Sequence, residues 1–323
     1  MRGPGRIAYG DMRHRRLGAS GLSVSRMALG TMTWGTVLAD EVCRDQLRTF
    51  LDAGGNLVDT AYGYGAGASE GILGSLLGDV VPRDELVICT KAGIERRGTE
   101  RVVDTSRGSL MRQLDTSLTR LGTNHVDLWL VHTWSDEAPL TETLSALEYA
   151  VGSGKARYVG VSNYSGWQSA RAFSLLESAR VPLVANEVEY SLVHRDPERE
   201  MAAAAEALGF GLLPWSPLGR GVLTGKYRSG VPSDSRAASR DFPNFVGRFL
   251  DDRSTSVVEA VVTAARGLRV SASEVALAWL RDRPGVVAPI VGARTTAQLR
   301  TALSSEDLEL PTELAEALDE VSA

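Results

Sequence analysis

Four side chains that can hold or transfer a proton stand at the downstream ends of three short apolar runs. They are Asp59, Tyr64, Lys91 and His132. The runs that lead to them cover residues 56–59, 86–91 and 127–132. A carboxyl, a phenol, an amine and an imidazole are the groups that enzymes use for general acid–base catalysis. If the runs are neighbouring parallel strands, their carboxyl ends meet at one edge and the four groups form a proton-transfer site.

Lys91 is informative because lysine is rare in this chain. The chain has three lysines: Lys91, Lys155 and Lys226. A buried ammonium can be tuned, whereas a guanidinium cannot give up its proton. A cation beside a phenol favours the phenolate, so we expect Lys91 to lower the pKa of Tyr64. Asp59 would pair with Lys91 and offset the cost of burying it, and His132 would hydrogen-bond the oxygen that receives the proton.

Apolar runs recur along the chain and alternate with stretches of helical periodicity. The eight runs cover residues 27–31, 56–59, 86–91, 127–132, 158–162, 183–187, 211–215 and 287–291. Helical spacing is found in residues 40–53, 107–121, 141–151, 197–208, 254–268 and 272–281. Continuous apolar runs are typical of parallel strands that are buried on both faces. We therefore predict a (β/α)8 TIM barrel, with an open doubly wound sheet as the alternative.

The segments outside this pattern also carry predictions. Residues 1–12 are basic and lack the apolar stretch of a signal peptide, so we expect a disordered extension before a single domain of residues 13–323. Residues 15–18 and 22–25 predict a β-hairpin that closes the bottom of the barrel. Residues 227–252 are too long for an ordinary connection and are interpreted as a lid, with a plain insert as the alternative.

Charge and composition exclude several classes of partner. The formal net charge of -5 argues against nucleic acid and anionic membrane surfaces, and the chain has no run of 18 apolar residues that would span a bilayer. The two cysteines, Cys43 and Cys89, indicate a reducing compartment rather than a disulfide scaffold. We expect a cytoplasmic protein that acts on a small molecule and has no metal site, since it lacks a histidine-rich cluster. The oligomeric state is left open.

Several further motifs occur in a fixed order around the four side chains. They cover residues 56–65, 90–91, 127–132, 154–163, 186–191, 215–226 and 292–294. With these motifs the chain resembles the aldo-keto reductase family from about Leu17 to Val321, and in particular its bacterial members and the potassium-channel beta subunits. The resemblance implies NADPH-dependent reduction of an aldehyde or ketone by hydride transfer. Tyr64 would be the general acid, Asp59 and Lys91 would tune it, and His132 would orient the carbonyl.

The same resemblance implies that NADP binds without a Rossmann domain, and no Gly-x-Gly-x-x-Gly joins an early strand to a helix. The nicotinamide would contact Gly30, Thr31, Met32, Ser162, Asn163 and Trp215. The pyrophosphate would contact Ser216, Leu218, Gly221 and Lys226. The adenosine and its 2'-phosphate would lie among Arg236, Arg294 and Gln298. Glu187, Pro217 and Gly292 complete the predicted set. Arginine binds phosphate bidentately, which favours NADP over NAD.

The chain departs from the family pattern at two places. Glu187 stands where the family usually has glutamine beside the carboxamide, and an ionised carboxylate can accept a hydrogen bond there but cannot donate one. Thr301 and Ala302 stand where the family often has Glu-Asn near the adenine. We also expect apolar substrate walls from Trp34, Tyr62, Trp134 and residues 242–249.

Other functions fit parts of this pattern. One is a biosynthetic ketoreductase that acts on a nucleotide-linked sugar, which would have the same four side chains. Another is an NADP(H)-binding regulatory subunit that senses redox state; His132 argues against it, because the channel-associated relatives commonly replace that histidine. A third is an unrelated hydrolase or lyase on the same barrel, which would need a metal or phosphate site that the sequence does not indicate.

Overall fold

The computed structural model describes residues 11–98, 100–233, 235–238 and 245–323, apart from the side chains of Arg97 and Arg236. The predicted extension therefore lies outside the described residues except for Asp11 and Met12. Met12 is buried against the core. No helix of the described residues is long and apolar enough to cross a membrane.

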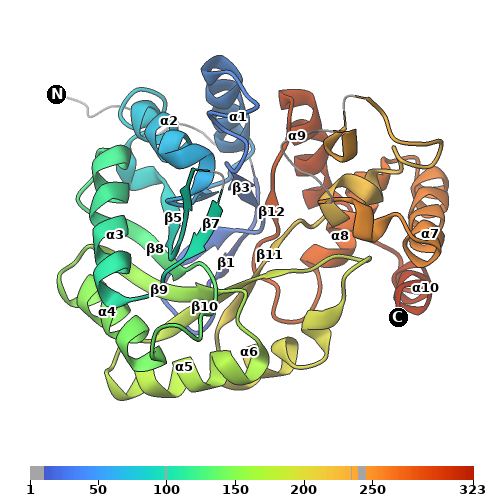
Figure 1. The fold of residues 1–323 in the computed structure, drawn as a ribbon. Coiled ribbons are helices and arrows are strands. Elements are labelled where there is room, and N and C mark those ends of the chain that lie inside the picture. Colours follow the sequence, from blue (N-terminus) through green and yellow to red (C-terminus); the bar gives the residue numbers. More distant parts are fainter. Residues whose placement is uncertain (1–10, 99, 234, 239–244) are drawn as a thin grey trace.

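Eight parallel strands form a single sheet (Figure 1). In chain order they are β3 (Ala28–Gly30), β4 (Leu57–Asp59), β5 (Val87–Ala92), β8 (Val126–Val131), β9 (Ala156–Ser162), β10 (Leu183–Glu189), β11 (Gly211–Trp215) and β12 (Ile290–Val291). Their spatial order is β11-β10-β9-β8-β5-β4-β3-β12. The sheet closes where Leu212 forms a parallel bridge with Val286, and the Val287 N–H donates to the Leu212 carbonyl at 2.9 Å. The predicted barrel is confirmed, and the open sheet is wrong.

Ten α-helices are described, and they surround the barrel (Figure 1). They are α1 (Asp40–Asp52), α2 (Ala68–Leu76), α3 (Arg107–Leu121), α4 (Leu140–Gly152), α5 (Gly166–Ser178), α6 (Met201–Leu208), α7 (Asp252–Leu268), α8 (Ala272–Arg281), α9 (Thr296–Leu303) and α10 (Thr312–Ser322). Short 3-10 turns are η1 (Tyr64–Gly67), η2 (Arg83–Glu85), η3 (Asp196–Glu198), η4 (Gly219–Thr224), η5 (Arg236–Ala238), η6 (Gly247–Phe249) and η7 (Ser304–Asp307).

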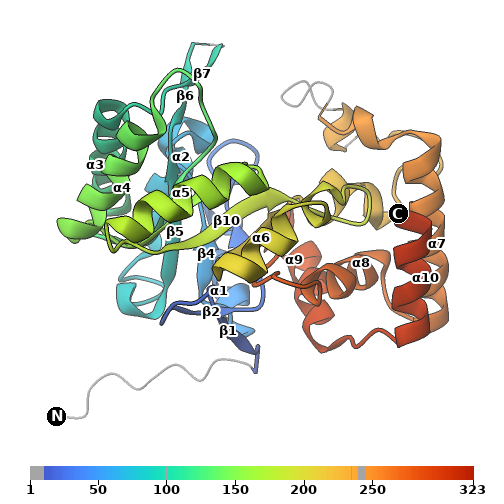
Figure 2. The same cartoon turned by 90° about the horizontal axis from the view of Figure 1, so that it is seen from below.

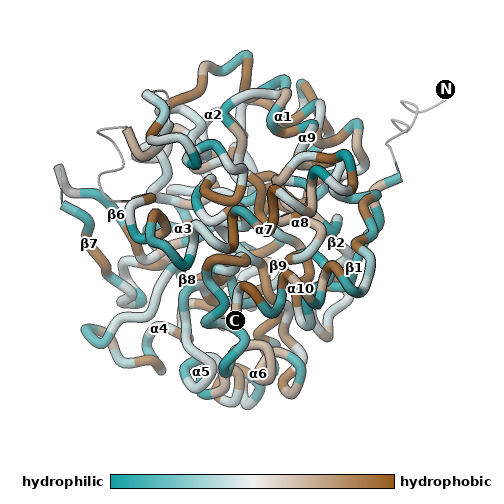
Figure 3. The backbone as a smooth tube through the Cα atoms, turned by 90° about the vertical axis from the view of Figure 1, so that its right-hand side faces the viewer, coloured by the Kyte–Doolittle hydropathy of each residue, from teal (hydrophilic) through white to brown (hydrophobic). Residues whose placement is uncertain are grey.

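Local sequence explains where these helices begin and end. Gly122 ends α3 in the left-handed conformation at φ 63°, which glycine adopts without strain. Asp251 begins α7 by accepting a hydrogen bond from the Ser254 N–H at 2.8 Å. The predicted helix 197–208 is divided into η3 and α6, because Glu200 has a non-helical backbone at φ -134°. The outer helices alternate between hydrophilic and hydrophobic residues, as amphipathic helices on a barrel should (Figure 3).

The bottom of the barrel is closed by the hairpin that the sequence predicts. Strands β1 (His14–Arg16) and β2 (Ser23–Ser25) pair antiparallel. Leu17 and Val24 are fully buried and pack with inward side chains of the barrel strands, such as Leu57 and Leu128. These side chains fill the barrel interior, so the fold has a packed core and not a pore.

A second hairpin was not predicted. Strands β6 (Ile94–Arg97) and β7 (Glu100–Val103) follow β5 directly and pair antiparallel. Figure 2 shows that this hairpin projects beyond the barrel. Its strands, Ile-Glu-Arg-Arg and Glu-Arg-Val-Val, do not alternate polar and apolar residues, so they do not stand out as strands in the sequence. It places several arginines just after Lys91.

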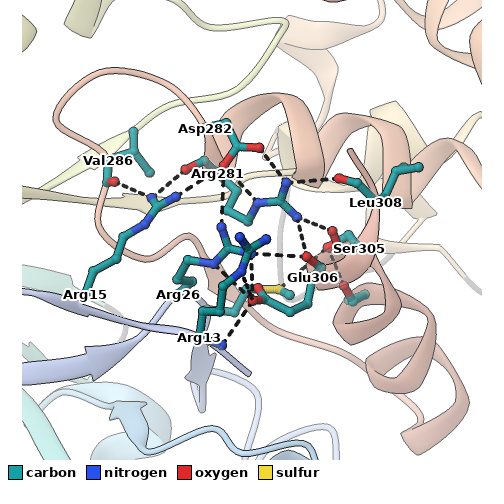
Figure 4. Close-up of polar contacts among 11 residues, drawn as sticks. Arg13, Arg15, Arg26, Arg281, Asp282, Val286, Ser305, Glu306 and Leu308 are labelled. Carbon is teal, nitrogen blue, oxygen red and sulfur yellow. Dashed lines mark hydrogen bonds and ion pairs between the residues drawn. The ribbon is translucent and has the colours of Figure 1, made fainter. Parts of the chain in front are cut away.

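Charged side chains join the first hairpin to the C-terminal part of the chain (Figure 4). Arg26 donates to Glu306 Oε1 at 3.0 and 2.7 Å. Arg15 donates to the carbonyl oxygens of Arg281 and Val286 at 2.7 and 2.8 Å, and Arg281 donates to the carbonyl oxygen of Leu308 at 2.9 Å. The side chains of Arg26 and Glu306 are only 7% and 8% exposed, so each buried charge depends on the other as its counter-charge.

Replacing Glu306 should therefore destabilise the protein. Glu306→Ala leaves the buried Arg26 guanidinium without its carboxylate, and we expect the free energy of unfolding to fall by about 3 kcal/mol. Chemical denaturation measures this change. Arg13→Ala is the matched control: the Arg13 side chain lies 3.7 Å from the same carboxylate but is 59% exposed, so its loss should cost under about 1 kcal/mol. Equal losses for both variants would contradict the assignment.

Candidate active site

Lys91 is the centre of the site. Its ammonium donates to both carboxylate oxygens of Asp59 at 2.7 Å and to the carbonyl oxygen of Thr60 at 2.9 Å. The Tyr64 hydroxyl lies 3.4 Å from the same nitrogen. Lys91 is fully buried and Asp59 is 3% exposed, and a charge in such a place is stable only when it is paired and hydrogen-bonded.

Strand register brings Asp59 and Lys91 together. Asp59 lies beside Cys89 in the pairing of β4 with β5. Side chains alternate along a strand, so Lys91, two residues beyond Cys89, points to the same inner face. Thr90 points the other way, where its hydroxyl donates to Glu70 of α2 at 2.7 Å. The sequence interpretation that these strand ends meet is therefore correct in its geometry.

Tyr64 is held by the turn that follows β4. The chain bends through η1, where Gly65 and Ala66 have φ of 56° and 54°. Gly67 has φ 98°, a left-handed conformation that favours glycine at this position. The Tyr64 ring meets the His132 ring edge-on, with centroids 5.9 Å apart. The turn thus points the phenol into the space between Lys91 and His132.

Burial decides the protonation of this phenol. It raises the pKa of Tyr64 above its ordinary value, and Lys91 only partly offsets this effect. Lys91 acts to lower the pKa of Tyr64, as expected, but the net shift is upward because the cost of burying a phenolate exceeds the attraction of one ammonium. Burial also acts to lower the pKa of Lys91, but Asp59 and Glu187 outweigh it and hold that pKa well above its usual value. At neutral pH the pair is a neutral phenol beside a charged ammonium.

His132 is a neutral imidazole at the edge of the same space. Burial, followed by the nearby charges of Lys91 and Arg101, holds the pKa of His132 well below its usual value. Its backbone N–H donates to the Ala92 carbonyl at 2.8 Å, which fixes its position after β8. The Nδ1 atom is buried and has no hydrogen-bond partner among the described residues. The ring nitrogens of a neutral imidazole can donate one hydrogen bond and accept another.

Glu187 belongs to the same buried group. Its side chain is 3% exposed, and Oε2 lies 3.2 Å from the Lys91 ammonium. This oxygen is an ion-pair neighbour of Lys91 but has no hydrogen-bond partner in the described part of the chain. The side-chain ligand atoms of Asp59, Cys89 and Glu187 lie within 4.8 Å of one another. The Lys91 ammonium supplies the cation between the two carboxyl groups.

The Asn163 side chain connects the ends of β8, β9 and β11 at the mouth of the barrel. It has the left-handed φ of 59°, which asparagine tolerates better than most residues. Its amide donates to the His132 carbonyl at 3.0 Å and to the Ser162 hydroxyl at 2.9 Å, and it accepts from the Trp215 indole N–H at 3.0 Å. The half-buried Trp215 ring is thereby fixed near the mouth. Ser162 in turn donates to the Glu187 carbonyl at 3.1 Å.

The backbone after β11 forms a concave turn that suits an anion. Ser216, Gly219, Arg220 and Gly221 all have positive φ, at 52°, 55°, 58° and 96°. The Gly219 and Gly221 N–H groups donate within the turn, to the carbonyl oxygens of Ser216 and Leu218 at 2.9 Å, so the charge for an anion comes from a side chain. A Cβ at Gly221 would lie 3.3 Å from the Lys226 ammonium, so this cation lies over the turn. These residues fit a pyrophosphate, together with Pro217 and Leu218 at the start of the turn.

The remaining predicted cofactor residues lie at two other places. Gly30 ends β3, where a Cβ would come within 2.8 Å of Ile290, and Thr31 donates its hydroxyl to the Asp59 carbonyl at 2.9 Å. Met32 and Gly292 follow β3 and β12. At the N-terminus of α9, Gln298 accepts from the Arg294 N–H at 3.0 Å. Thr301 is half-buried and Ala302 is buried. The side chain of Arg236 lies outside the described residues.

The structure places the side chains that the sequence assigned to the substrate wall. Trp34 is fully buried and donates to the Gln46 side chain at 3.1 Å, so its assignment to the substrate wall is wrong. Tyr62 lies under the Arg120 guanidinium, 4.6 Å from its ring centre, and Trp134 packs edge-on against Tyr164. Phe242 lies outside the described residues.

A salt-bridge clasp beside the turn was not predicted. Arg220 donates to both carboxylate oxygens of Glu189 at 2.8 and 2.9 Å and to the Phe245 carbonyl at 2.6 Å. Arg248 donates to the same carboxylate at 2.5 Å. The clasp ties the end of the segment 227–252 to β10. These residues are far apart in the sequence, and no local pattern links them.

Comparisons with known proteins show the family of this chain. The model of the Aldo/keto reductase family matches residues 26–323, so the chain belongs to this family. It is 34% identical over 299 residues to the L-glyceraldehyde 3-phosphate reductase of Escherichia coli strain K12, covering 90% of this chain and 86% of the relative. It is 32% identical to the uncharacterized oxidoreductase YrpG of Bacillus subtilis, with 96% of each chain covered.

A probable voltage-gated potassium channel subunit beta of Oryza sativa subsp. japonica is 33% identical, over 97% of this chain and 96% of that relative. The resemblance inferred from the motifs is thus confirmed. The family and its oxidoreductase relatives make this chain an oxidoreductase of the carbonyl-reducing type.

Proposed function

We infer that the protein reduces an aldehyde or ketone to an alcohol with NADPH, and that Tyr64 is the general acid. The observation that carries this proposal is the buried ammonium of Lys91, paired with Asp59 at 2.7 Å and lying 3.4 Å from the Tyr64 hydroxyl. Bound NADPH supplies the hydride that the carbonyl carbon receives. The family membership supports the reaction class.

The chain's own groups handle the proton. Tyr64 keeps its proton at neutral pH because burial raises its pKa, so it can donate to the oxygen that becomes an alkoxide. As the proton leaves, the phenolate that forms lies beside the Lys91 ammonium, which stabilises it. The neutral His132 imidazole can donate a hydrogen bond to the same oxygen, which stabilises the developing charge.

The most direct test is removal of the phenolic hydroxyl. Tyr64→Phe should lower the rate of carbonyl reduction by about 10² to 10⁴-fold, because the general acid is lost. The affinity for NADPH, measured by fluorescence titration, should stay within about threefold of wild type. Tyr149→Phe is the control, since that ring is 48% exposed and lies on α4. Wild-type turnover in Tyr64→Phe with intact cofactor binding would refute the assignment.

NADP is the proposed cofactor because cations and an anion-binding turn lie where its phosphates would bind. The turn at Gly221 and the Lys226 ammonium suit the pyrophosphate, and Arg294 at the start of α9 suits the 2'-phosphate. The Trp215 ring offers a flat apolar face to the nicotinamide. Asn163 and Ser162 lie beside it for the carboxamide.

Arg294→Ala should separate NADP from NAD. Loss of one charged hydrogen bond to the 2'-phosphate should weaken NADPH binding by about tenfold or more, while NADH binding stays within about twofold. Arg300→Ala, an exposed arginine on the same helix, should change neither affinity. Titration calorimetry with both cofactors gives the comparison. An equal loss for NADH and NADPH would contradict a role at the 2'-phosphate.

The physiological carbonyl compound is a separate proposal. We propose that it carries an anionic group such as a phosphate. Arg96 and Arg101 lie directly opposite each other on the β6–β7 hairpin, an arrangement that is unfavourable for like charges. Arg101 is exposed and close enough to help lower the pKa of His132. An anion between the hairpin and His132 would relieve this repulsion. The E. coli relative, whose name gives a phosphorylated aldehyde, supports the same class.

Paired substrates test this proposal. Arg101→Ala should lower kcat/KM for L-glyceraldehyde 3-phosphate by about tenfold relative to wild type, with little change for unphosphorylated L-glyceraldehyde. Arg107→Ala, an exposed arginine at the start of α3, is the control. Equal effects on both substrates would count against an anion site on the hairpin. Nucleotide-linked keto sugars belong in the same panel, because they also carry phosphate.

A regulatory subunit that senses NADP(H) is the second candidate, favoured by the similarity to the potassium channel subunit. It predicts that NADPH binds without turnover of any carbonyl compound. Oxidation of NADPH by any member of the panel, abolished in Tyr64→Phe, would decide for the reductase.

A further inference from the structure

Glu187 places a second carboxyl group beside the one ammonium of the site. Its Oε2 lies 3.2 Å from Lys91 Nζ, the same nitrogen that is paired with Asp59 at 2.7 Å. The Lys91 ammonium already donates to Asp59 and to the Thr60 carbonyl. The two oxygens of the Asp59 carboxylate can share one N–H, and Thr60 accepts a second, so one N–H remains, and both Tyr64 and Glu187 are within its reach. The two acceptors therefore compete for Lys91.

The charge count of this buried group decides the competition. With both carboxyl groups ionised, the centre holds two negative charges and one positive charge, and all three side chains are enclosed. An unbalanced buried charge is costly. A neutral Glu187 removes the imbalance, and its hydroxyl can donate to Asp59, whose carboxylate lies within 4.8 Å in the same buried group. Glu187 Oε2 has no hydrogen-bond partner among the described residues, so it is the oxygen that can carry this proton.

We propose that Glu187 is a pH-dependent positioning residue for the reduction. When Glu187 is a neutral acid, the remaining N–H of Lys91 is available to hydrogen-bond Tyr64. When Glu187 is a carboxylate, it accepts that hydrogen bond, and its negative charge opposes the loss of the Tyr64 proton. The inference rests on the proposed role of Tyr64. It differs from a contact with the cofactor, because Glu187 acts through Lys91 on the proton donor.

The groups around Glu187 agree on when it titrates. Asp59 faces it from β4, Cys89 and Lys91 from β5, and Tyr64 from η1. Burial, reinforced by Asp59 and only partly offset by Lys91, raises the pKa of Glu187 from 4.5 to about 8. The pKa values of Tyr64, Cys89 and Lys91 are all raised above their usual values. A change of activity near pH 8 is therefore assigned to Glu187 and not to these three neighbours.

The activity test compares pH profiles. Single-turnover oxidation of NADPH by an accepted aldehyde should fall in the wild type above about pH 8, to about one tenth of its plateau at pH 9. Glu187→Gln imitates the neutral acid, so its rate, normalised to its own value at pH 6, should stay level to pH 9. Superimposed profiles of the wild type and Glu187→Gln would overturn the inference.

Glu70→Gln is the matched control for this comparison. Glu70 is also fully buried and also contacts the strand of Lys91, through the Thr90 hydroxyl at 2.7 Å, but it pairs with Arg120 at 3.1 Å and lies outside the centre. Its variant should keep the wild-type inflection near pH 8. A profile that is flattened in Glu70→Gln as much as in Glu187→Gln would show a general effect of removing buried carboxyl groups, and would overturn the assignment to Glu187.

Two measurements are independent of turnover. The folded state holds the Glu187 proton up to about pH 8, whereas the unfolded chain releases it near 4.5. The wild type therefore loses stability as pH rises between these values, so its Tm should fall relative to Glu187→Gln across this window. Infrared spectra of wild-type protein with isotope-labelled glutamate should show a protonated carboxyl group at pH 7 that disappears by about pH 9.

These measurements separate the two hypotheses. A wild type without any reductase activity would refute the proposed function, while the infrared and Tm results would still report on the Glu187 proton. An active enzyme with no protonated glutamate at pH 7 would refute only the further inference. The infrared experiment needs no variant, so it decides the question even if Glu187→Gln does not fold.

Discussion

The buried ammonium of Lys91 is the constraint on which the site depends. An enclosed positive charge is stable only with a counter-charge and with acceptors for its protons. Asp59 and the Thr60 carbonyl provide these from β4, at distances of 2.7 and 2.9 Å. A shift of one residue between β4 and β5 would turn one of the two charges to the other face of the sheet. The ion pair therefore penalises every alternative register of these strands as well as preparing the chemistry.

The same exclusion of water sets the protonation of the groups around Lys91. Burial keeps Tyr64 a phenol and His132 a neutral imidazole, since each would be charged in its other form. The ammonium then interacts weakly with the neutral phenol and strongly with the phenolate that forms as the proton is transferred. An interaction that strengthens along the reaction lowers the barrier, whereas one that is equally strong at the start does not. A raised net pKa of Tyr64 is thus compatible with the proposed role of Tyr64 as an acid, although Lys91 by itself acts to lower that pKa.

The sequence predicted the features that depend on local patterns. The eight apolar runs became the eight barrel strands, and Gly122 and Asp251 end and begin helices as their residue types indicate. Features that depend on distant contacts were missed. The clasp between Glu189 and Arg220 joins residues on different elements, and the wall assignment of Trp34 failed because Gln46 of α1 draws its indole into the core. The side-chain direction of Glu187 belongs to this second class, since only the folded barrel places it at Lys91.

Charge is distributed in the site according to what each part must bind. At the centre, one ammonium faces two carboxyl groups, and a neutral Glu187 leaves this group without net charge. Over the turn after β11, the Lys226 ammonium is the positive charge that the phosphates of the proposed cofactor would meet. A proton can leave Tyr64 most easily where no uncompensated negative charge is near, and phosphate binds best where positive charge is in excess. An acid in place of an amide at position 187 changes the charge near Tyr64 but not the positive charge around the turn after β11. We therefore expect it to affect the proton transfer more than the binding of the cofactor.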